Sequence, residues 1–104
     1  MKVIVCGAGQ VGFHIARHLA RQNNDVTVID RSPELVQKIR ESLDVQALEG
    51  FASDPNMLEK AGAEGTDMII AVTQADEVNM VACQVAHSLF KVPTKIARVR
   101  NQSY

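Results

Sequence analysis

Three glycines near the start of the chain have the spacing of a phosphate-binding turn. Gly7, Gly9 and Gly12 come directly after the short apolar run from Val3 to Cys6, and they form the pattern G-x-G-x-x-G. In a dinucleotide-binding turn, the first glycine permits the tight bend, the second lets a pyrophosphate approach the backbone, and the third lets the following helix pack closely. The free N–H groups at the start of that helix then face the phosphates.

An acidic residue at the end of the second apolar run could bind a ribose. Asp30 follows the run from Val26 to Ile29, close to the spacing expected of a ribose-binding carboxylate. A carboxylate accepts hydrogen bonds from ribose hydroxyls and repels a 2′-phosphate, so the sequence favours NAD over NADP. The alternative is that Asp30 only caps the helix that follows. The next residue, Arg31, either stacks on an adenine or points into water.

Further candidate site residues stand where the later apolar runs end. Ala52, Ser53 and Asp54 could line an adenine pocket, although Asp54 is equally suited to cap a helix. Thr73 could reach the phosphates or the second nucleoside. Arg98 is a candidate for the far side of the cleft, and the alternative for it is a solvated charge at the edge of the sheet.

These residues need a scaffold that brings the ends of several strands together. Apolar runs and helix signals predict strands at residues 3–6, 26–29, 45–48, 68–72 and 95–99, and helices at 10–22, 33–43, 56–61 and 76–90. The strand-like runs are too apolar for a sheet with one solvated face, which favours a parallel sheet covered on both faces. With right-handed crossovers, the chain is predicted to be an α/β, Rossmann-like doubly wound sheet with strand order 3-2-1-4-5. Ligands bind at the carboxyl ends of the strands in such a sheet.

The bulk composition is that of one compact globular domain. The chain has 104 residues, 46% of them hydrophobic, and a formal net charge of −1, so nothing in this balance indicates a nucleic-acid partner. No apolar run approaches the ~20 residues that span a bilayer. Met1 and Lys2 lead directly into the first strand, so we expect no signal peptide. Cys6 and Cys83 are expected to be reduced, buried thiols.

The sequence contains little that indicates catalysis. His14 and His18 have the four-residue spacing of a two-histidine metal site, but no third ligand is apparent, so an exposed polar helix face explains them better. Neither a nucleophile–base pair nor a G-x-S-x-G motif is present. A binding module without turnover is therefore the favoured class of function. The alternative is a cofactor-binding fragment of an NAD-dependent dehydrogenase.

The predicted helix at 76–90 carries two apolar stripes. The first is expected to face the sheet and consists of Val78, Val81, Ala82, Val85 and Leu89. The second lies further around the helix and consists of Met80, Cys83, His87 and Phe90. Because a helix that covers an isolated domain needs only one apolar face, the second stripe favours a homo-oligomer. The alternative is one wide core face, with Cys83 and Phe90 tucked under neighbouring loops.

Several segments together resemble the TrkA family. They are Val3–Gly12, Val28–Arg31, Glu49–Gly50 with Asp54, Asp67–Thr73 with Asp76–Asn79, and Ile96–Asn101. The similarity is to the nucleotide-binding RCK N-terminal (KTN) domain of bacterial potassium-uptake regulators, and it covers essentially the whole chain. The glycine motif is shared with many dehydrogenases, whereas the later segments are more particular to this family.

The resemblance implies a regulatory subunit rather than an enzyme. Such a subunit is cytoplasmic, lies at the inner face of the cell membrane through its transporter partner, and binds NAD(H) or, in some members, ATP or ADP. It gates a membrane potassium transporter of the TrkH/KtrB kind, on which RCK domains pair and form rings. Because family members usually continue into a C-terminal RCK domain, residues 1–104 are expected to be a single nucleotide-binding domain from a longer chain.

The same resemblance implies roles for individual positions. The residues expected to hold the phosphates are Gly7, Gly9, Gln10, Val11 and Gly12. Asp30 would hold the ribose. The residues expected around the adenine side are Arg31, Ala52, Ser53 and Asp54. Thr73 and Arg98 would reach the far half of the ligand.

Overall fold

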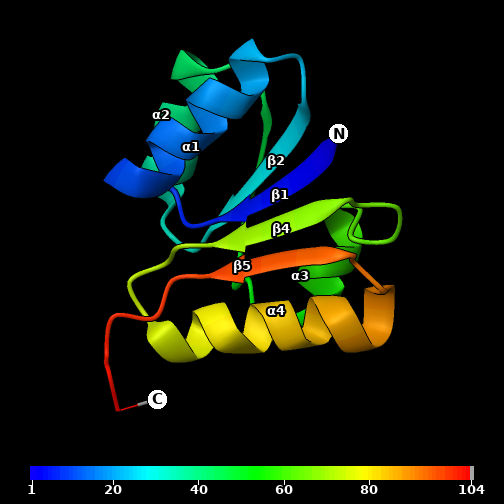
Figure 1. The fold of residues 1–104 in the computed structure, drawn as a ribbon. Helices are drawn as coiled ribbons and strands as arrows, with labels where there is room; N and C mark the ends of the chain where they lie inside the picture. The colour runs from blue at the N-terminus through cyan, green and yellow to red at the C-terminus, as the bar shows by residue number, and fades with distance from the viewer. Residues whose placement is uncertain (104) are drawn as a thin grey trace.

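A parallel five-stranded sheet forms the centre of the molecule, with helices on both of its faces (Figure 1). The computed structural model describes residues 1–103, and Tyr104 lies outside them. The strands are β1 (Lys2–Cys6), β2 (Asp25–Asp30), β3 (Gln46–Glu49), β4 (Met68–Ala71) and β5 (Thr94–Ala97). The helices are α1 (Gln10–Arg21), α2 (Pro33–Ser42), α3 (Pro55–Lys60) and α4 (Asp76–Phe90). Each predicted element is present, with its bounds within two residues of those expected.

The order of the strands is β3-β2-β1-β4-β5, and every neighbouring pair is parallel, which confirms the predicted doubly wound topology. Cys6 in β1 is level with Ile29 in β2 and with Ala71 in β4. Asp30 and Glu49 are paired at the ends of β2 and β3. The carboxyl ends of the strands therefore reach the same edge of the sheet, and the turns that follow them meet there.

The two layers of helices bury two separate hydrophobic clusters. Figure 1 shows α1 and α2 on one side of the sheet and α3 and α4 on the other. Since side chains alternate along a strand, Val3 and Val5 of β1 enter the cluster under α1 and α2, whereas Ile4 and Cys6 enter the cluster under α3 and α4. All of them are fully buried. The central strand is thus anchored from both faces, which fixes the starting point of the glycine turn.

The helices that follow β2 and β3 begin with side-chain caps. Ser32 Oγ accepts the backbone N–H of Leu35 at 3.3 Å, and Asp54 Oδ1 accepts that of Asn56 at 2.9 Å. A proline follows each cap at the start of the helix, where a backbone N–H would have no helical acceptor. These caps fix the loops that run along the carboxyl edge of the sheet.

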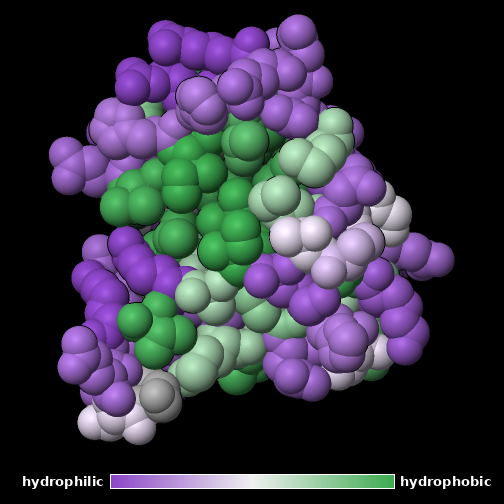
Figure 2. Space-filling view, in the orientation of Figure 1, coloured by the Kyte–Doolittle hydropathy of each residue, from purple (hydrophilic) through white to green (hydrophobic). Residues whose placement is uncertain are grey.

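One part of the sheet face on the α1 side is open to solvent. Figure 2 shows apolar side chains gathered on this face, between α1 and β5. Ile96 in β5 is 48% exposed, and Val11 at the start of α1 is 46% exposed. Val11 and Ile96 therefore leave apolar surface exposed on this face of the sheet.

The predicted sheet-facing stripe of α4 is partly confirmed, because Ala82 is in the core cluster and Val78 and Val85 pack against it. It is wrong for Val81 and Leu89. Val81 is 45% exposed and Leu89 is 60% exposed, and the buried residues of the helix are Asp76, Asn79, Ala82 and Ala86. Alanines let the helix lie close to the sheet, and Asn79 is buried at no great cost because its side chain is hydrogen-bonded. Cys83 and Phe90 pack against the core cluster, as in the alternative of one wide core face. These two residues therefore give no support to an interface.

Candidate functional site

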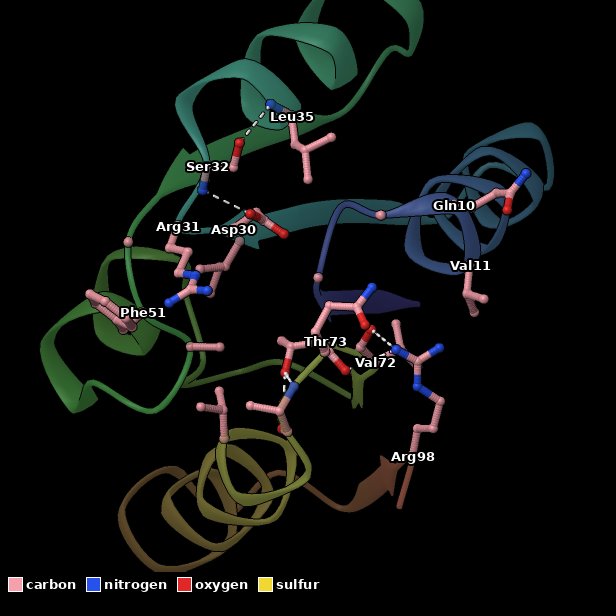
Figure 3. Close-up of a pocket in the computed structure, with 18 of the residues that line it drawn as sticks. Gln10, Val11, Asp30, Arg31, Ser32, Leu35, Phe51, Val72, Thr73 and Arg98 are labelled. Atoms are coloured by element: carbon pink, nitrogen blue, oxygen red, sulfur yellow. Dashed lines mark hydrogen bonds between the residues drawn. The ribbon is translucent and has the colours of Figure 1, made fainter. Parts of the chain in front are cut away.

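A cavity of about 480 Å³ lies over the carboxyl ends of the strands (Figure 3). Its walls come from the glycine turn after β1, the ends of β2 and β3, the turn between β4 and α4, and the segment after β5. The predicted site residues that line it are Gly7, Gly9, Gln10, Val11, Asp30, Arg31, Ala52, Thr73 and Arg98. The sheet thus brings together residues that lie far apart in the sequence. Gly12, Ser53 and Asp54, which were predicted as well, are not part of the lining.

The glycines of the turn are needed for different reasons. Gly7 has a φ of +111°, and a Cβ there would lie 2.8 Å from the carbonyl oxygen of Val72. A Cβ on Gly12 would collide with the carbonyl oxygen of Gly7. A Cβ on Gly9, by contrast, would meet no atom within 4 Å. The fold itself requires Gly7 and Gly12, whereas the space beside Gly9 is free for a ligand to approach the backbone.

The start of α1 offers backbone donors to the cavity. Gly9 is the N-cap residue, and no side chain in the described part of the chain caps this helix. The N–H groups of Gln10 and Val11 therefore have no helical acceptor, and both residues line the cavity. No acidic side chain lies in the first turn. These donors and the positive end of the helix dipole suit a phosphate.

The side chain of Asp30 ties the glycine turn to the start of α2. Its Oδ2 accepts the backbone N–H of Ala8 at 2.7 Å, and its Oδ1 accepts that of Ser32 at 2.8 Å. Asp30 is not the cap of α2, because that cap is Ser32; the bond to Ser32 instead holds the residue that caps the helix. Each carboxylate oxygen has a second lone pair, and Asp30 also lines the cavity. The carboxylate can therefore accept ribose hydroxyls while it keeps both backbone donors.

The turn between β4 and α4 is held by a buried asparagine. Asn79 Oδ1 accepts the backbone N–H of Thr73 at 2.8 Å and the Thr73 hydroxyl at 2.7 Å. Its Nδ2 donates to the carbonyl oxygens of Thr73 and Arg98 at 3.2 and 2.9 Å. Asn79 is fully buried. It therefore joins the turn after β4 to the segment after β5.

Arg98 reaches from the segment after β5 to the same turn. Its Nη2 donates to the carbonyl oxygens of Val72 and Thr73, each at 2.8 Å. Its Nε is buried and has no hydrogen-bond partner among the described residues. The guanidinium is thus fixed at the far end of the cavity and has N–H donors to spare for a ligand.

Asp76 fastens the segment after β5 to the start of α4. Its Oδ1 accepts the backbone N–H of Arg100 at 3.1 Å, and its Oδ2 accepts that of Asn101 at 2.8 Å. These two bonds hold the pKa of Asp76 below its ordinary value. Arg100 Nη2 in turn donates to the backbone and side-chain oxygens of Gln74, each at 3.0 Å. The far wall of the cavity is therefore one hydrogen-bonded unit.

Comparison of the sequence with known protein families identifies the family of this chain. The model of the TrkA-N domain matches residues 3–104. The chain belongs to the TrkA-N domain family. Over its full 104 residues, this TrkA-N domain is 59% identical to the Trk system potassium uptake protein TrkA of Azorhizobium caulinodans, and it spans 23% of the length of that relative. The resemblance inferred from the sequence is confirmed.

Solved structures share the fold of this TrkA-N domain. The NAD(P)-binding domain of an exopolyphosphatase-related protein from Archaeoglobus fulgidus has a TM-score of 0.83 and 22% identity, over 97% of this chain and 74% of that one. The GsuK channel bound to NAD has a TM-score of 0.76 and 18% identity, over 89% of this chain and 17% of the channel chain. At these identities, the likeness establishes the Rossmann-like fold.

The described part of the TrkA-N domain has no group of three or more His, Cys, Asp or Glu side chains that could hold a metal ion. His14 and His18 are exposed, and His14 Nδ1 lies 3.0 Å from Nη2 of Arg17. Cys6 is fully buried, and burial raises the pKa of its thiol, which suits a structural rather than a nucleophilic cysteine. Within residues 1–103, no helix has both the length and the apolar character to cross a membrane.

Sequence reasoning assigned no individual role to two residues that shape the cavity of this TrkA-N domain. Asn79 could have been identified from the sequence, because asparagine is unfavourable inside a helix unless its side chain has a specific hydrogen-bond partner. Phe51 lines the cavity beside Ala52. The segment 50–54 was expected at the carboxyl ends of the strands, but the sequence does not show whether the Phe51 ring is exposed, since that depends on how the loop packs.

Proposed function

We propose that this TrkA-N domain is the nucleotide-binding regulatory part of a potassium-uptake system, and that it binds NAD(H), with ADP or ATP as the alternative ligand. The observation that carries the proposal is the meeting, at one cavity, of a glycine turn that is open at Gly9 and the carboxylate of Asp30. A dinucleotide or a nucleoside polyphosphate needs both, because its phosphates need bare backbone donors and its ribose needs an acceptor.

The ligand is proposed to lie along the cavity with its phosphates in the middle. They would accept from the N–H groups at Gln10 and Val11, and Asp30 would accept from the ribose. The base would lie toward Arg31 and Ala52. The remaining part of the ligand would extend toward the hydrogen-bonded far wall, where Thr73 and Arg98 line the cavity.

Four predicted residues are proposed to support the site through the shape of its loops. Gly7 and Gly12 allow the turn to close, as the positions of their missing Cβ atoms indicate. Asp54 caps α3, and Ser53 precedes it in the same loop. This loop carries Ala52 to the cavity wall.

The domain is proposed to regulate transport rather than to catalyse a reaction. The name of the Azorhizobium caulinodans relative, a Trk system potassium uptake protein, supports this role. The proposed partner is a membrane potassium transporter of the TrkH/KtrB kind, contacted from the cytoplasm by a homo-oligomer. Residues 1–104 would form a single domain within a protein of the relatives' greater length.

Calorimetric titration of the chain with NAD⁺, NADH, ADP and ATP tests ligand binding. We expect saturable binding of at least one of them, and mass spectrometry of ligand released from the purified protein identifies the one bound in cells. If none binds, the proposal is wrong. Substrate-dependent reduction of NAD⁺ across a panel of 2-hydroxy acids and alcohols would instead identify the chain as part of a dehydrogenase.

A chimeric protein tests the regulatory role. The matching part of the Azorhizobium caulinodans relative is replaced by this chain, which is 59% identical to it. The chimera is expected to restore potassium uptake in cells that lack the relative, and its Gly9→Val variant is expected to fail. Sedimentation of the wild-type chain at several concentrations tests the proposed homo-oligomer. A chain that remains monomeric at high concentration would contradict self-association.

A further inference from the structure

Phe51 is the exposed aromatic side chain at the cavity. The sequence contains three phenylalanines. Phe13 lies edge-on to His14 and beneath the ammonium group of Lys38, and Phe90 packs against the core cluster. Phe51 is 58% exposed and lines the cavity. Aromatic side chains in this position commonly form part of a ligand site, because a bound ligand covers them.

The neighbours of Phe51 fix its direction. A Cβ on Gly50 would collide with the side chain of Met57, which fills the space beneath the loop. On the other side of Phe51, Ala52 is buried in the cluster under α3 and α4. The backbone N–H of Gly50 donates to the carbonyl oxygen of Asp30 at 2.9 Å. With its neighbours anchored, Phe51 stays at the rim instead of folding into the core.

Arg31 leaves the adjacent strand at the same level. Asp30 and Glu49 are paired at the ends of β2 and β3, so the residues after them emerge from neighbouring strands of the sheet. Arg31 is exposed and also lines the cavity. Figure 3 shows Arg31 and Phe51 at the same end of the cavity. A planar guanidinium and an aromatic ring both offer a flat surface on which a flat ligand group can stack.

The two ends of the cavity differ in chemistry. At the end with Phe51, its chain neighbour Ala52 lines the cavity, and the lining also includes the apolar side chains of Ile29 and Leu35. At the opposite end, Figure 3 shows Arg98 and Thr73 together with the apolar side chains of Val11 and Val72. Gln74 and Arg100 also line the cavity, and Arg100 is bonded to Gln74, so this end carries the polar and cationic groups of the segment after β5. A flat, weakly polar base therefore fits the end at Phe51, and a polar or anionic group fits the other end.

We propose that Phe51 and Arg31 form a base clamp that selects purine nucleotides. In this clamp, the base of the ligand stacks on the Phe51 ring, and the guanidinium of Arg31 closes the slot. A purine has a larger ring surface than a pyrimidine and gains more from such stacking. The inference rests on the proposed nucleotide-binding function and adds the residues that set the preference for the base. It holds for NAD(H) and for ADP or ATP alike, because these ligands share an adenosine.

Calorimetry with ADP, NADH and UDP tests the clamp. Phe51→Ala is expected to weaken the binding of ADP and NADH about 5- to 150-fold, the effect of losing one base–aromatic stack. UDP affinity should fall less, so the preference for ADP over UDP should shrink. The matched control is Leu89→Ala, which removes a similarly exposed apolar side chain, 60% exposed, from α4. Arg31→Lys keeps the charge but not the flat surface, so it should also weaken ADP binding.

A single tryptophan gives a direct reading of stacking, because the natural chain contains none. In Phe51→Trp, adding NAD⁺ or ADP is expected to quench the indole emission, since the base stacks on the indole. In Leu89→Trp, the same additions should leave the emission unchanged.

The outcomes separate the clamp from the nucleotide-binding function. If wild type binds ADP and NADH, but Phe51→Ala binds them equally well or the emission of Phe51→Trp does not change, the clamp is wrong and the proposed function stands. If wild type binds none of the three nucleotides, both are wrong.

Discussion

Asn79 Oδ1 accepts two hydrogen bonds from a single residue, Thr73, one from its backbone N–H and one from its hydroxyl. The same side chain donates to the carbonyl oxygens of Thr73 and Arg98. The side chain of one fully buried residue therefore makes four bonds that hold together the far wall of the cavity.

Asn79→Ala is expected to lower the free energy of unfolding by roughly 2–4 kcal/mol, because it leaves several buried backbone groups without a partner. Urea unfolding measures the change. Gln84→Ala is the control, since Gln84 is exposed and its amide bonds only across the surface of α4, to Ser88. Equal unfolding midpoints for the two variants would show that the network adds no stability.

Gly9→Val is expected to leave the fold intact and to abolish nucleotide binding. The backbone of Gly9 is extended, with a φ of −68°, and the space beside it is open, so the unfolding free energy should fall by no more than about 1 kcal/mol. The valine side chain would occupy the space that the phosphates need. The measurement is the melting temperature with and without NADH or ADP. If nucleotide raises it as much in Gly9→Val as in wild type, the phosphate site has been assigned wrongly.

Gly12→Ala, in contrast to Gly9→Val, is expected to destabilise the fold. Its Cβ would collide with the carbonyl oxygen of Gly7, so we expect a loss of roughly 1–3 kcal/mol or more in unfolding free energy even without a ligand. Thermal unfolding of the two glycine variants side by side checks the contrast. A Gly12→Ala protein as stable as wild type would mean that α1 can move away from the turn.

Asp30→Ala is expected to weaken nucleotide binding by about 1–3 kcal/mol, the cost of losing charged hydrogen bonds to the ribose. It also removes the acceptors for the backbone N–H groups of Ala8 and Ser32, so the ligand-free protein should be less stable. Asp30→Asn keeps the shape and one acceptor, and its stability should lie between those of wild type and Asp30→Ala. Calorimetry and urea unfolding measure the two effects separately. An Asp30→Ala protein with wild-type nucleotide affinity would restrict Asp30 to holding the backbone N–H groups of Ala8 and Ser32.

Asp76 should make the stability of the protein depend on pH. The backbone N–H groups of Arg100 and Asn101 hold its pKa below the ordinary value of 3.8. A carboxylate with a lowered pKa in the folded state stabilises that state at neutral pH, and the contribution is lost as the pH falls from about 4 through the lowered pKa. Asp76→Asn should therefore be less stable than wild type at pH 7, and the difference should shrink below about pH 4.

Urea unfolding between pH 7 and pH 3 measures that difference. Asp44→Asn controls for the removal of one negative charge, since Asp44 is exposed in the loop before β3. A gap between wild type and Asp76→Asn that is as large at pH 3 as at pH 7 would show that the charge of Asp76 is not what stabilises the segment.

The scaffold was predictable from the sequence because its signals are local. Each strand is a short apolar run. The side chains of Ser32 and Asp54 cap the helices that follow them, and such caps mark helix starts in the sequence. The strand order then follows from the handedness of the crossovers. The glycine turn and Asp30 could be placed at one edge of the sheet for the same reason.

The contacts of the far wall and the exposure of Val81 and Leu89 in α4 could not be predicted in this way. The bonds between Asn79 and the carbonyl oxygen of Arg98, and between the backbone N–H of Asn101 and Asp76, join residues that only the finished sheet brings together. The helical spacing of large apolar side chains predicts that Val81 and Leu89 face the core. The close approach of α4 to the sheet instead selects small side chains, and a hydrogen-bonded asparagine, for the buried face.

The unequal demands on the glycines of the turn bear on how such sequences evolve. A lineage that ceased to bind nucleotides would still have to keep Gly7 and Gly12, because the backbone around them has no room for a side chain. Position 9 has room for a side chain, so the residue there could change once nucleotide binding was lost. Among related chains, glycines at positions 7 and 12 therefore reflect the steric requirement of the turn, whereas the residue at position 9 reflects whether selection for a bound phosphate has continued.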